Sequence, residues 1–451
     1  MRIIIVGCGN VGAALTEQLS SEGHNITIID IENQRLQNLI NNYDAMGVVG
    51  NGASFAVQKE ADVEHAHLLI AVTGSDELNL LCCLIAKKAG GCHTIARVSN
   101  PIYNMEINYI KEELGLSMII NPEFAAASEM ARLLKFPSAI TIDAFAKGRV
   151  EMVKFRVKED SVLCDQSLKN ISGKLKADVL ICTVERGEDT YIPSGDFIIR
   201  EKDEISILGT TQKTLAFFKK LGVAVTRAKN VMIIGGGEMA YYLARQLIAM
   251  GIQIKIIEID KERCDELSEL LPKATIINGN GTDKDLLMQE GLMQMEAFVA
   301  LTNIDEENIM LSLFVKSLTD AKLITLVHRI SYDEIIDSLD IGSIIYPKYL
   351  TAENIIQYVR AMDNSIGSNI ESLYKMNDNK VEAMEFRVKE DSPVVGIPLQ
   401  DLPIKPKILI GSINHKGAIS IPGGQSIIQA GDTVIVVTTI TGLNDISDIL
   451  K

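Results

Sequence analysis

The strongest constraint on the fold is that the same series of motifs occurs in both halves of the sequence. Gly7-Cys8-Gly9-Asn10-Val11-Gly12 near the start is followed 228 positions later by Gly235-Gly236-Gly237-Glu238-Met239-Ala240. Near the end of each half, the segment Phe155 to Ser161 returns as Phe386 to Ser392. Tandem copies of a segment fold as repeated units of one architecture. The chain of 451 residues is therefore predicted to form two halves, about 1–226 and 227–451, with two parts in each.

The first part of each half alternates short β-rich runs with helical patterns. This alternation is typical of a doubly wound parallel sheet. A helix is also expected over 121–135, with Asn121 as its N-cap and Pro122 at its first position, and again from Pro347 to Met362. The strands expected in the first half lie at 2–6, 26–30, 45–49, 67–73, 94–98 and 117–120.

The second part of each half is shorter and rich in β-forming residues, with turn residues between the runs. In the first half its expected strands lie at 150–158, 178–186 and 203–209. The predicted fold class is α/β, with two Rossmann-like doubly wound parallel-sheet domains, each followed by a small α+β domain. The predicted domain ranges are 1–136, 137–226, 227–361 and 362–451.

Composition excludes several classes of protein. The chain has 44 Lys and Arg against 59 Asp and Glu, a net charge of −15, which argues against a general nucleic-acid binder because phosphate binding needs clustered cations. No apolar run approaches the roughly 20 residues of a membrane span, and the apolar N-terminal run is too short for a signal peptide. Seven cysteines without CxxC spacing indicate reduced thiols. We therefore expect a cytosolic protein.

The first glycine motif predicts a dinucleotide site. It follows an expected strand and opens an expected helix, as the Rossmann fingerprint requires. Gly7 would make the tight turn, Gly9 would let the backbone approach a pyrophosphate, and Gly12 would allow close packing of helix on sheet. Asp30 lies 18 residues after Gly12, and its carboxylate would accept from a ribose 2′-OH and repel a 2′-phosphate. The motif thus favours NAD(H) over NADP(H).

Other candidate ligand residues lie at the ends of later strands. Thr73 and Gly74 end the fourth strand, where Thr73 could bond a ribose or phosphate. Arg97 ends the fifth strand and could pair with a phosphate or with an acid across an interface. Asp76 is expected to cap the following helix. The second half supplies its own candidates, and its site is either occupied or vestigial. Glu238 brings a negative charge into the loop, which could oppose a diphosphate or point away and stabilise the helix start. These candidates are Gly235, Gly236, Gly237, Glu238, Met239, Glu258 and Thr302.

Two arginines and three cysteines are open to more than one interpretation. Arg35 and Arg263 each follow the acid by five residues. Either guanidinium could stack on adenine or reach a phosphate, but a solvated arginine at a helix start is the preferred interpretation. A zinc site is conceivable at Cys82, Cys83, Cys92 and His93, yet buried structural thiols are the preferred interpretation.

No set of residues for hydride-transfer chemistry is evident. None of the eleven tyrosines has a lysine four positions later, and no GxxxxGK[ST] loop occurs. A binding protein is therefore favoured. Two alternatives remain: an NAD-dependent oxidoreductase with a duplicated fold, and a nucleotide-binding scaffold unrelated to ions.

The duplicated motifs together resemble the TrkA family, the regulatory subunits of Trk-type potassium uptake. Members carry two nucleotide-binding domains of the KTN/RCK class, each followed by a small C-terminal domain. The resemblance rests on the opening MRIIIVGCGNVG, on Gly50-Asn51-Gly52 and on the repeated FRVKEDS, and it covers the whole chain. It places Gly7, Cys8, Gly9, Asn10, Val11, Gly12, Asp30, Asn51, Gly52, Thr73, Gly74 and Arg97 at ligand-contacting positions.

The resemblance also implies a function. It implies a non-enzymatic subunit on the cytoplasmic face of the membrane, beneath a potassium-translocating partner. NAD(H), and in some members ATP or ADP, would bias a ring-like dimer or tetramer between states.

Overall fold

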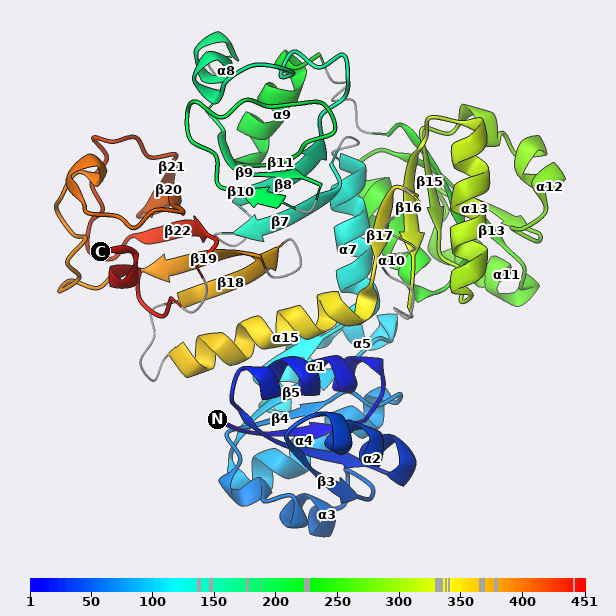
Figure 1. The fold of residues 1–451 in the computed structure, drawn as a ribbon. Coiled ribbons are helices and arrows are strands. Elements are labelled where there is room, and N and C mark those ends of the chain that lie inside the picture. Colours follow the sequence, from blue (N-terminus) through cyan, green and yellow to red (C-terminus); the bar gives the residue numbers. More distant parts are fainter. Residues whose placement is uncertain are drawn as a thin grey trace. The chain divides into compact units, whose positions relative to one another are not determined.

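The computed structural model describes residues 1–135, 139–145, 149–175, 178–187, 189–222, 228–328, 336, 339, 341–364, 370–376, 380–440 and 443–451. The chain divides into two compact units: Met1–Ala131 with Lys229–Ile356, and Arg132–Ala228 with Gln357–Lys451. Figure 1 labels their helices and strands. Each unit therefore draws one part from each half. The domain boundaries expected at 136/137 and 226/227 lie outside the described residues.

The first unit begins with a six-stranded parallel sheet in the order β3-β2-β1-β4-β5-β6. Strands β1 and β4 are buried along almost their whole length, as expected for a sheet with helices on both faces. All six expected strands are confirmed. The strands are β1 Arg2–Val6, β2 Asn25–Asp30, β3 Ala45–Val49, β4 Leu68–Ala71, β5 His93–Arg97 and β6 Met118–Ile120.

The helices of this first fold begin at the expected signals, with one correction. Asn121 caps α7 as predicted, because its Oδ1 accepts a hydrogen bond from the Phe124 backbone N–H at 2.7 Å. The prediction that Asp76 caps α4 is wrong: Ser75 is the cap and accepts from the Leu78 N–H. The helices are α1 Asn10–Ser21, α2 Asn33–Asn42, α3 Phe55–Glu60, α4 Asp76–Gly90, α5 Pro101–Met105, α6 Ile107–Glu113 and α7 Pro122–Lys135, with a 3-10 turn at Val63–His65.

The second fold of this unit repeats the first. Its parallel sheet has the order β14-β13-β12-β15-β16-β17, the same pattern of crossovers. Its strands are β12 Asn230–Ile234, β13 Gln253–Glu258, β14 Thr275–Asn278, β15 Ala297–Ala300, β16 Lys322–Leu326 and β17 Ser343–Ile345. Its helices are α10 Glu238–Ala249, α11 Lys261–Leu270, α12 Lys284–Gln289, α13 Asp305–Leu318 and α15 Pro347–Asn364, with a 3-10 turn at Leu292–Gln294.

The two parallel-sheet folds contact each other within the first unit through α10 and the start of α7. The Tyr242 hydroxyl donates to the Ser99 carbonyl at 3.1 Å and accepts from the Asn121 amide at 3.1 Å. The Tyr242 ring also packs edge-on against Phe124, with centroids 5.6 Å apart. Tyr242 is buried, so these hydrogen bonds satisfy a polar group that would be costly to bury alone.

The second unit consists of two five-stranded antiparallel sheets with matching topology, in the orders β10-β9-β11-β8-β7 and β21-β20-β22-β19-β18. The first contains β7 Thr141–Phe145, β8 Val150–Arg156, β9 Leu180–Arg186, β10 Asp189–Tyr191, β11 Glu204–Gly209 and the helices α8 Leu168–Leu175 and α9 Thr211–Lys220. The second contains β18 Ile370–Met376, β19 Val381–Arg387, β20 Ile408–His415, β21 Ala418–Ser420, β22 Thr433–Thr438 and 3-10 turns at Leu399–Asp401 and Ile446–Ile449.

The two small sheets share one apolar core. Side chains of β8 and β11, such as Met152 and Leu208, pack in the same buried cluster as Ala383 and Val437 from β19 and β22. Burial of this shared surface holds the sheets together by the hydrophobic effect. The small domains are thus paired within their unit, which the sequence alone did not indicate.

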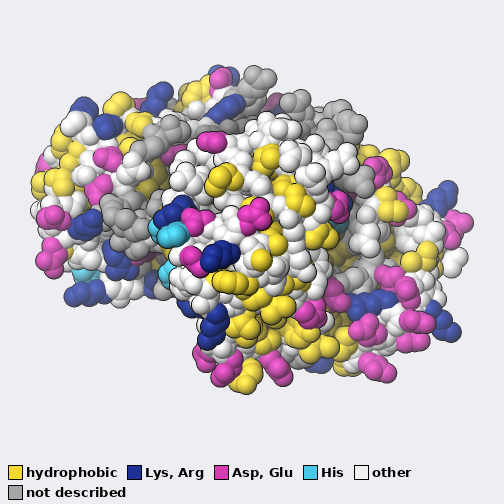
Figure 2. Space-filling view, turned by 90° about the horizontal axis from the view of Figure 1, so that it is seen from below, with side chains coloured by type: hydrophobic (Ala, Val, Ile, Leu, Met, Phe, Trp, Pro, Cys, Tyr) yellow, Lys and Arg dark blue, Asp and Glu magenta, His cyan; other side chains and the backbone are white. Residues whose placement is uncertain are grey.

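The surface has mixed charge. On the face shown in Figure 2, Lys and Arg side chains lie among Asp and Glu, and the described residues of that face form no continuous basic band. In the part of the chain that the structure describes, no helix combines the length and the apolar character needed to cross a bilayer.

A pH dependence of stability is expected from Asp143 on β7. Burial raises the pKa of its carboxyl to about 6, while Arg132 and Lys154 act in the opposite direction. A carboxyl whose pKa is raised on folding stabilises the fold below its ordinary pKa, and this contribution is lost as the pH rises through 6. At pH 7, Asp143→Asn should therefore have a free energy of unfolding about 1–3 kcal/mol higher than the wild type. Its thermal midpoint should be higher as well. At pH 4 the two thermal midpoints should coincide. A variant less stable than the wild type at pH 7 would contradict this assignment.

Candidate functional site

The first glycine loop joins β1 to α1 at the carboxyl edge of the sheet. Gly7 has φ +110°, and a Cβ there would lie 3.1 Å from the backbone of Val72 and 3.2 Å from that of Thr73. A Cβ on Gly12 would collide with the Gly7 carbonyl. These two glycines are therefore required by the turn and by helix packing, as their spacing predicted.

Gly9 plays a different part. A Cβ there would meet no atom within 4 Å, so its lack of a side chain is not needed for packing. Gly9 is the N-cap of α1 and provides no side-chain hydrogen bond to it, and the first turn of the helix carries no acidic residue. Backbone N–H groups at such a helix start favour an anion. The loop thus fits a pyrophosphate.

Asp30 is fixed beside this loop. Its Oδ2 accepts from the Cys8 backbone N–H at 2.5 Å and its Oδ1 accepts from the Glu32 N–H at 2.8 Å. Burial, followed by the charge of Asp30, raises the pKa of the Cys8 thiol to about 12, so Cys8 stays a neutral thiol at pH 7. The Asp30 carboxylate remains the acceptor in this corner, as an adenosine ribose requires.

A buried amide, Asn79, ties the end of β4 to the end of β5. The Asn79 Oδ1 accepts from both the backbone N–H and the hydroxyl of Thr73, at 2.8 and 2.7 Å. Its Nδ2 donates to the carbonyls of Thr73 and Arg97, at 3.2 and 3.0 Å. Thr73 therefore gives its hydroxyl proton to Asn79, and its position is set by that residue. The sequence did not predict that Asn79 holds these strand ends, although its recurrence as Asn308 was a usable signal.

The same arrangement recurs in the second fold. Asn308 accepts from the N–H and hydroxyl of Thr302, at 2.9 and 2.8 Å, and donates to the carbonyls of Thr302 and Leu326. Asn79 and Asn308 are both fully buried. Each amide ties the end of one strand to the end of the next.

Asn79→Leu is expected to lower the free energy of unfolding by about 2–4 kcal/mol, because buried donors and an acceptor lose their partners. Asn308→Leu should have a similar effect. Urea unfolding followed by circular dichroism measures both. The control is Asn42→Leu, at an exposed position in α2. A loss below about 1 kcal/mol in both variants would show that the amides are dispensable.

Other predicted residues hold the loops in place. Asn51 Oδ1 accepts from the Ala53 N–H at 2.9 Å and shapes the turn after β3. Gly52 lies so close to β1 that a Cβ would collide with Val6, and its carbonyl accepts from the buried Gln58 amide at 2.7 Å. Gly74 has open space around it. These residues lie at the same sheet edge as the glycine loop.

Arg97 pairs with an acid, one of the two kinds of partner expected for it, whereas Asp76 has partners that the sequence did not predict. The Arg97 Nη2 lies 3.1 Å from the Glu123 Oε1 in the first turn of α7. Asp76 accepts from the backbone N–H groups of Ser99 and Asn100, at 3.0 and 2.8 Å. Asp76 therefore secures the loop after β5.

The second glycine loop repeats the backbone of the first. Gly235 has φ +96°, and the Glu258 Oε2 accepts from the Gly236 N–H at 2.5 Å, as Asp30 does from Cys8. Ala240 is fully buried and Met239 is 9% exposed. The skeleton of a dinucleotide fold is thus present in both halves.

The two loops differ in how their arginines are held. The three cysteines considered for zinc are buried, as expected. Arg35 is 61% exposed and pairs with Glu32, as a solvated arginine would. The same interpretation is wrong for Arg263, which is 19% exposed and donates from Nε to the Gly236 carbonyl at 2.7 Å. The thiols preferred as structural are indeed buried: Cys82, Cys83 and Cys92.

Both halves of the chain are similar to one known protein family. The TrkA-N domain model matches residues 3–122 and 231–347, and the TrkA-C domain model matches 152–222 and 383–451. A Trk system potassium uptake protein TrkA homolog of Archaeoglobus fulgidus is 31% identical over 452 residues, covering both chains completely. TrkA homolog 1 of Methanosarcina mazei is 30% identical over 459 residues, again covering both completely. Among solved structures, the GsuK channel bound to NAD has a TM-score of 0.64 at 16% identity, covering 97% of this chain and 76% of that one, which shows a shared fold.

Proposed function

Because the chain belongs to the TrkA family, whose two domain models match both of its halves, we propose that it is a nucleotide-binding regulatory subunit of potassium uptake. NAD(H) binds at the first glycine loop and biases the protein between two conformations. These conformations open or close a membrane potassium-translocating partner on whose cytoplasmic face the protein sits. The names of the relatives, which are potassium uptake proteins, support the potassium part of this proposal.

One observation carries the nucleotide part: the start of α1 is free to receive an anion. Gly9 leaves open space in front of the helix, and no acidic residue lies in its first turn. Asp30 is held next to the loop by two backbone hydrogen bonds. These residues would hold the pyrophosphate and one ribose of NAD(H). ATP or ADP, which share the adenosine and phosphates, are alternative ligands of this loop.

Binding without chemistry suits a sensor. A ligand shifts a conformational equilibrium only by its difference in affinity for the two states. A coupling of the usual size, about 1–3 kcal/mol, changes the ratio of the states by about 5–150-fold. The protein in this proposal is a homo-oligomer, a dimer or a tetramer, whose nucleotide-binding folds form a ring. It is not an enzyme, and the nucleotide is released without chemical change.

The choice of nucleotide is tested at Asp30. Asp30→Ala is expected to weaken NADH binding about 10–100-fold, because a charged acceptor for the ribose is lost. NADPH, which the wild type should discriminate against, should bind the variant nearly as well as NADH. Calorimetry with both nucleotides measures this, and Asp44→Ala, an exposed aspartate of the same fold, is the control. Wild-type preference for NADPH would contradict the role of Asp30.

The regulatory role is tested by potassium flux. The protein is co-expressed with its potassium-translocating subunit in a bacterial strain that lacks its own potassium uptake. Growth at low external potassium should require both proteins, and flux into vesicles made from these cells should respond to NADH. Uptake that is independent of the protein would reject the regulatory role. Steady oxidation of NADH by the purified protein with a small-molecule substrate would favour the oxidoreductase instead.

A further inference from the structure

The two glycine loops have the same backbone but opposite charge at the helix start. The residue after the second glycine of the motif is Asn10 in the first loop and Glu238 in the second, and each is the first residue of its helix. A helix side chain leans toward the N-terminal end of its helix. Glu238 therefore directs a carboxylate toward the position where a dinucleotide fold receives its pyrophosphate.

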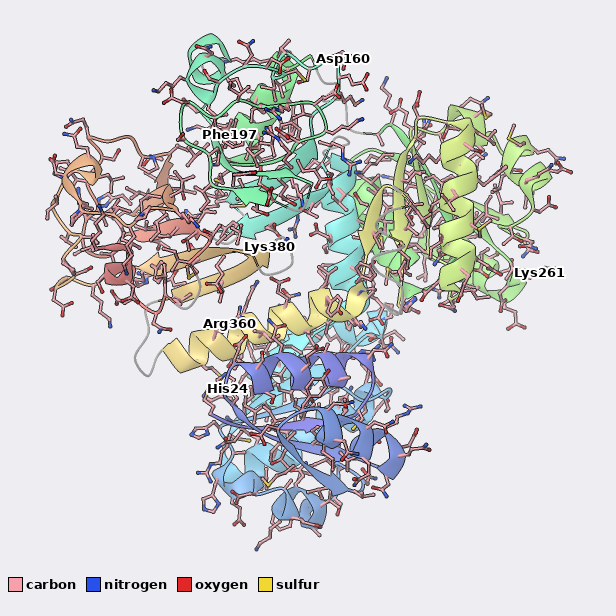
Figure 3. All side chains as sticks on the ribbon, viewed as in Figure 1. His24, Asp160, Phe197, Lys261, Arg360 and Lys380 are labelled. Atoms are coloured by element: carbon pink, nitrogen blue, oxygen red, sulfur yellow. The ribbon has the colours of Figure 1, made fainter. Side chains whose placement is uncertain are left out.

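Arg263 holds this carboxylate over the loop. Its Nε donates to the Gly236 carbonyl, and its Nη2 lies 3.5 Å from the Glu238 Oε1. Its Nη1 also donates to Glu266 at 2.6 Å. Arg263 is the third residue of α11, whose first residue, Lys261, is labelled in Figure 3. A guanidinium with these three partners bridges the loop, the helix start and α11.

Three charged side chains act on Glu238: Arg263, Glu266 and Glu123. Burial raises the pKa of the Glu238 carboxyl. Arg263 lowers this pKa, whereas the charges of Glu266 and Glu123 raise it further. The carboxylate nevertheless has a stabilising position, since a negative charge interacts favourably with the start of a helix. A bound diphosphate would have to take that position, where it would meet the Glu238 carboxylate.

The first loop lacks this arrangement. Asn10 is neutral, and Arg35 is paired with Glu32 at a largely exposed position. The first helix start is therefore open to an outside anion, whereas the second already has one. The residues of the second loop do not fit a dinucleotide, although its backbone does.

We propose that the carboxylate of Glu238, fixed by Arg263, occupies the anion position of the second glycine loop, so that this fold binds no nucleotide diphosphate. The chain then holds one nucleotide, at the first loop. The second fold stays in a single state because no nucleotide diphosphate binds to it. This inference rests on the proposed nucleotide binding of the first loop, and it assigns Glu238 as the residue that makes the two folds differ.

Calorimetry on the full chain with NADH, and separately with ADP, tests the proposal. The wild type should bind one nucleotide per chain, and Gly9→Asp, which fills the first loop, should bind none. Gly9→Asp combined with Glu238→Asn, which gives the second loop the residue of the first, should regain one site. The affinity of the second loop should rise by about 100-fold or more when the charge is removed. Circular dichroism and thermal unfolding verify that each variant is folded.

The reverse exchange provides the matched control. Asn10→Glu should lower the affinity of the first loop by a similar factor. Two nucleotides per wild-type chain, or one in Gly9→Asp, would overturn the proposal. A folded double variant that still binds none would also overturn the assignment to Glu238. If the wild type binds none but Glu238→Asn alone binds one, nucleotide binding at the first loop is rejected while the role of Glu238 stands.

Discussion

Replacing Gly9 with Asp is expected to weaken NADH binding by about 100-fold or more, because a carboxylate then stands where the pyrophosphate must lie. The fold should be retained, since a Cβ at Gly9 would meet no atom within 4 Å and its φ of −69° suits any residue. Aspartate is also a favourable N-cap, so α1 should be no less stable. Calorimetry with NADH measures the loss, and thermal unfolding shows that the fold is intact.

The duplication supplies a matched control for this experiment. Gly237 is the N-cap of α10, has φ −64°, and likewise has open space at its Cβ position. Gly237→Asp makes the same chemical change in the second fold and should leave NADH binding at the first loop unaltered. Undiminished NADH binding in a folded Gly9→Asp variant would remove the first loop from the nucleotide site.

The second large effect is expected in the small domains, at a buried ion pair. Arg186 Nε and Nη2 each donate to Asp203 at 2.8 Å, and the Arg200 N–H donates to the same carboxylate. The Asp203 side chain is fully buried, and Arg186 lies over the ring of Phe197, labelled in Figure 3. Asp203→Ala should lower the free energy of unfolding by about 3–5 kcal/mol, because the partner of a partly buried guanidinium is removed.

The corresponding site of the second half should respond less. There His415 Nδ1 lies 2.6 Å from Asp432, whose other oxygen accepts from the Gln429 N–H. An imidazole can become neutral when its acid is removed, whereas a guanidinium cannot. Asp432→Ala should therefore cost about 1–3 kcal/mol. Urea unfolding of both variants at pH 7 measures the difference. A larger loss for Asp432→Ala than for Asp203→Ala would contradict this explanation.

The sequence by itself determined the strands of the first parallel sheet and the fold class of the parts of each half. The strands of the first sheet could be placed because buried parallel strands are short apolar runs ended by turn residues. Asn121 with Pro122 marked the start of α7, because capping depends on residues adjacent in the chain. The duplication showed that the same fold occurs twice. The roles of Gly7 and Gly12 also followed from their spacing. Gly7 is needed for the backbone conformation of its own turn, and Gly12 is needed for close packing of its helix.

Only the tertiary structure decided which side chains meet. Asp76 looked like a helix cap, but it accepts hydrogen bonds from Ser99 and Asn100, which lie more than twenty positions away. Arg35 and Arg263 occupy equivalent positions in the sequence, yet one is solvated and the other is bound to a glycine loop. The physical reason is that a hydrogen bond or ion pair requires a partner within a few ångströms. For a long polar side chain, that partner is chosen by the packing of distant strands and helices, which sequence periodicity does not record.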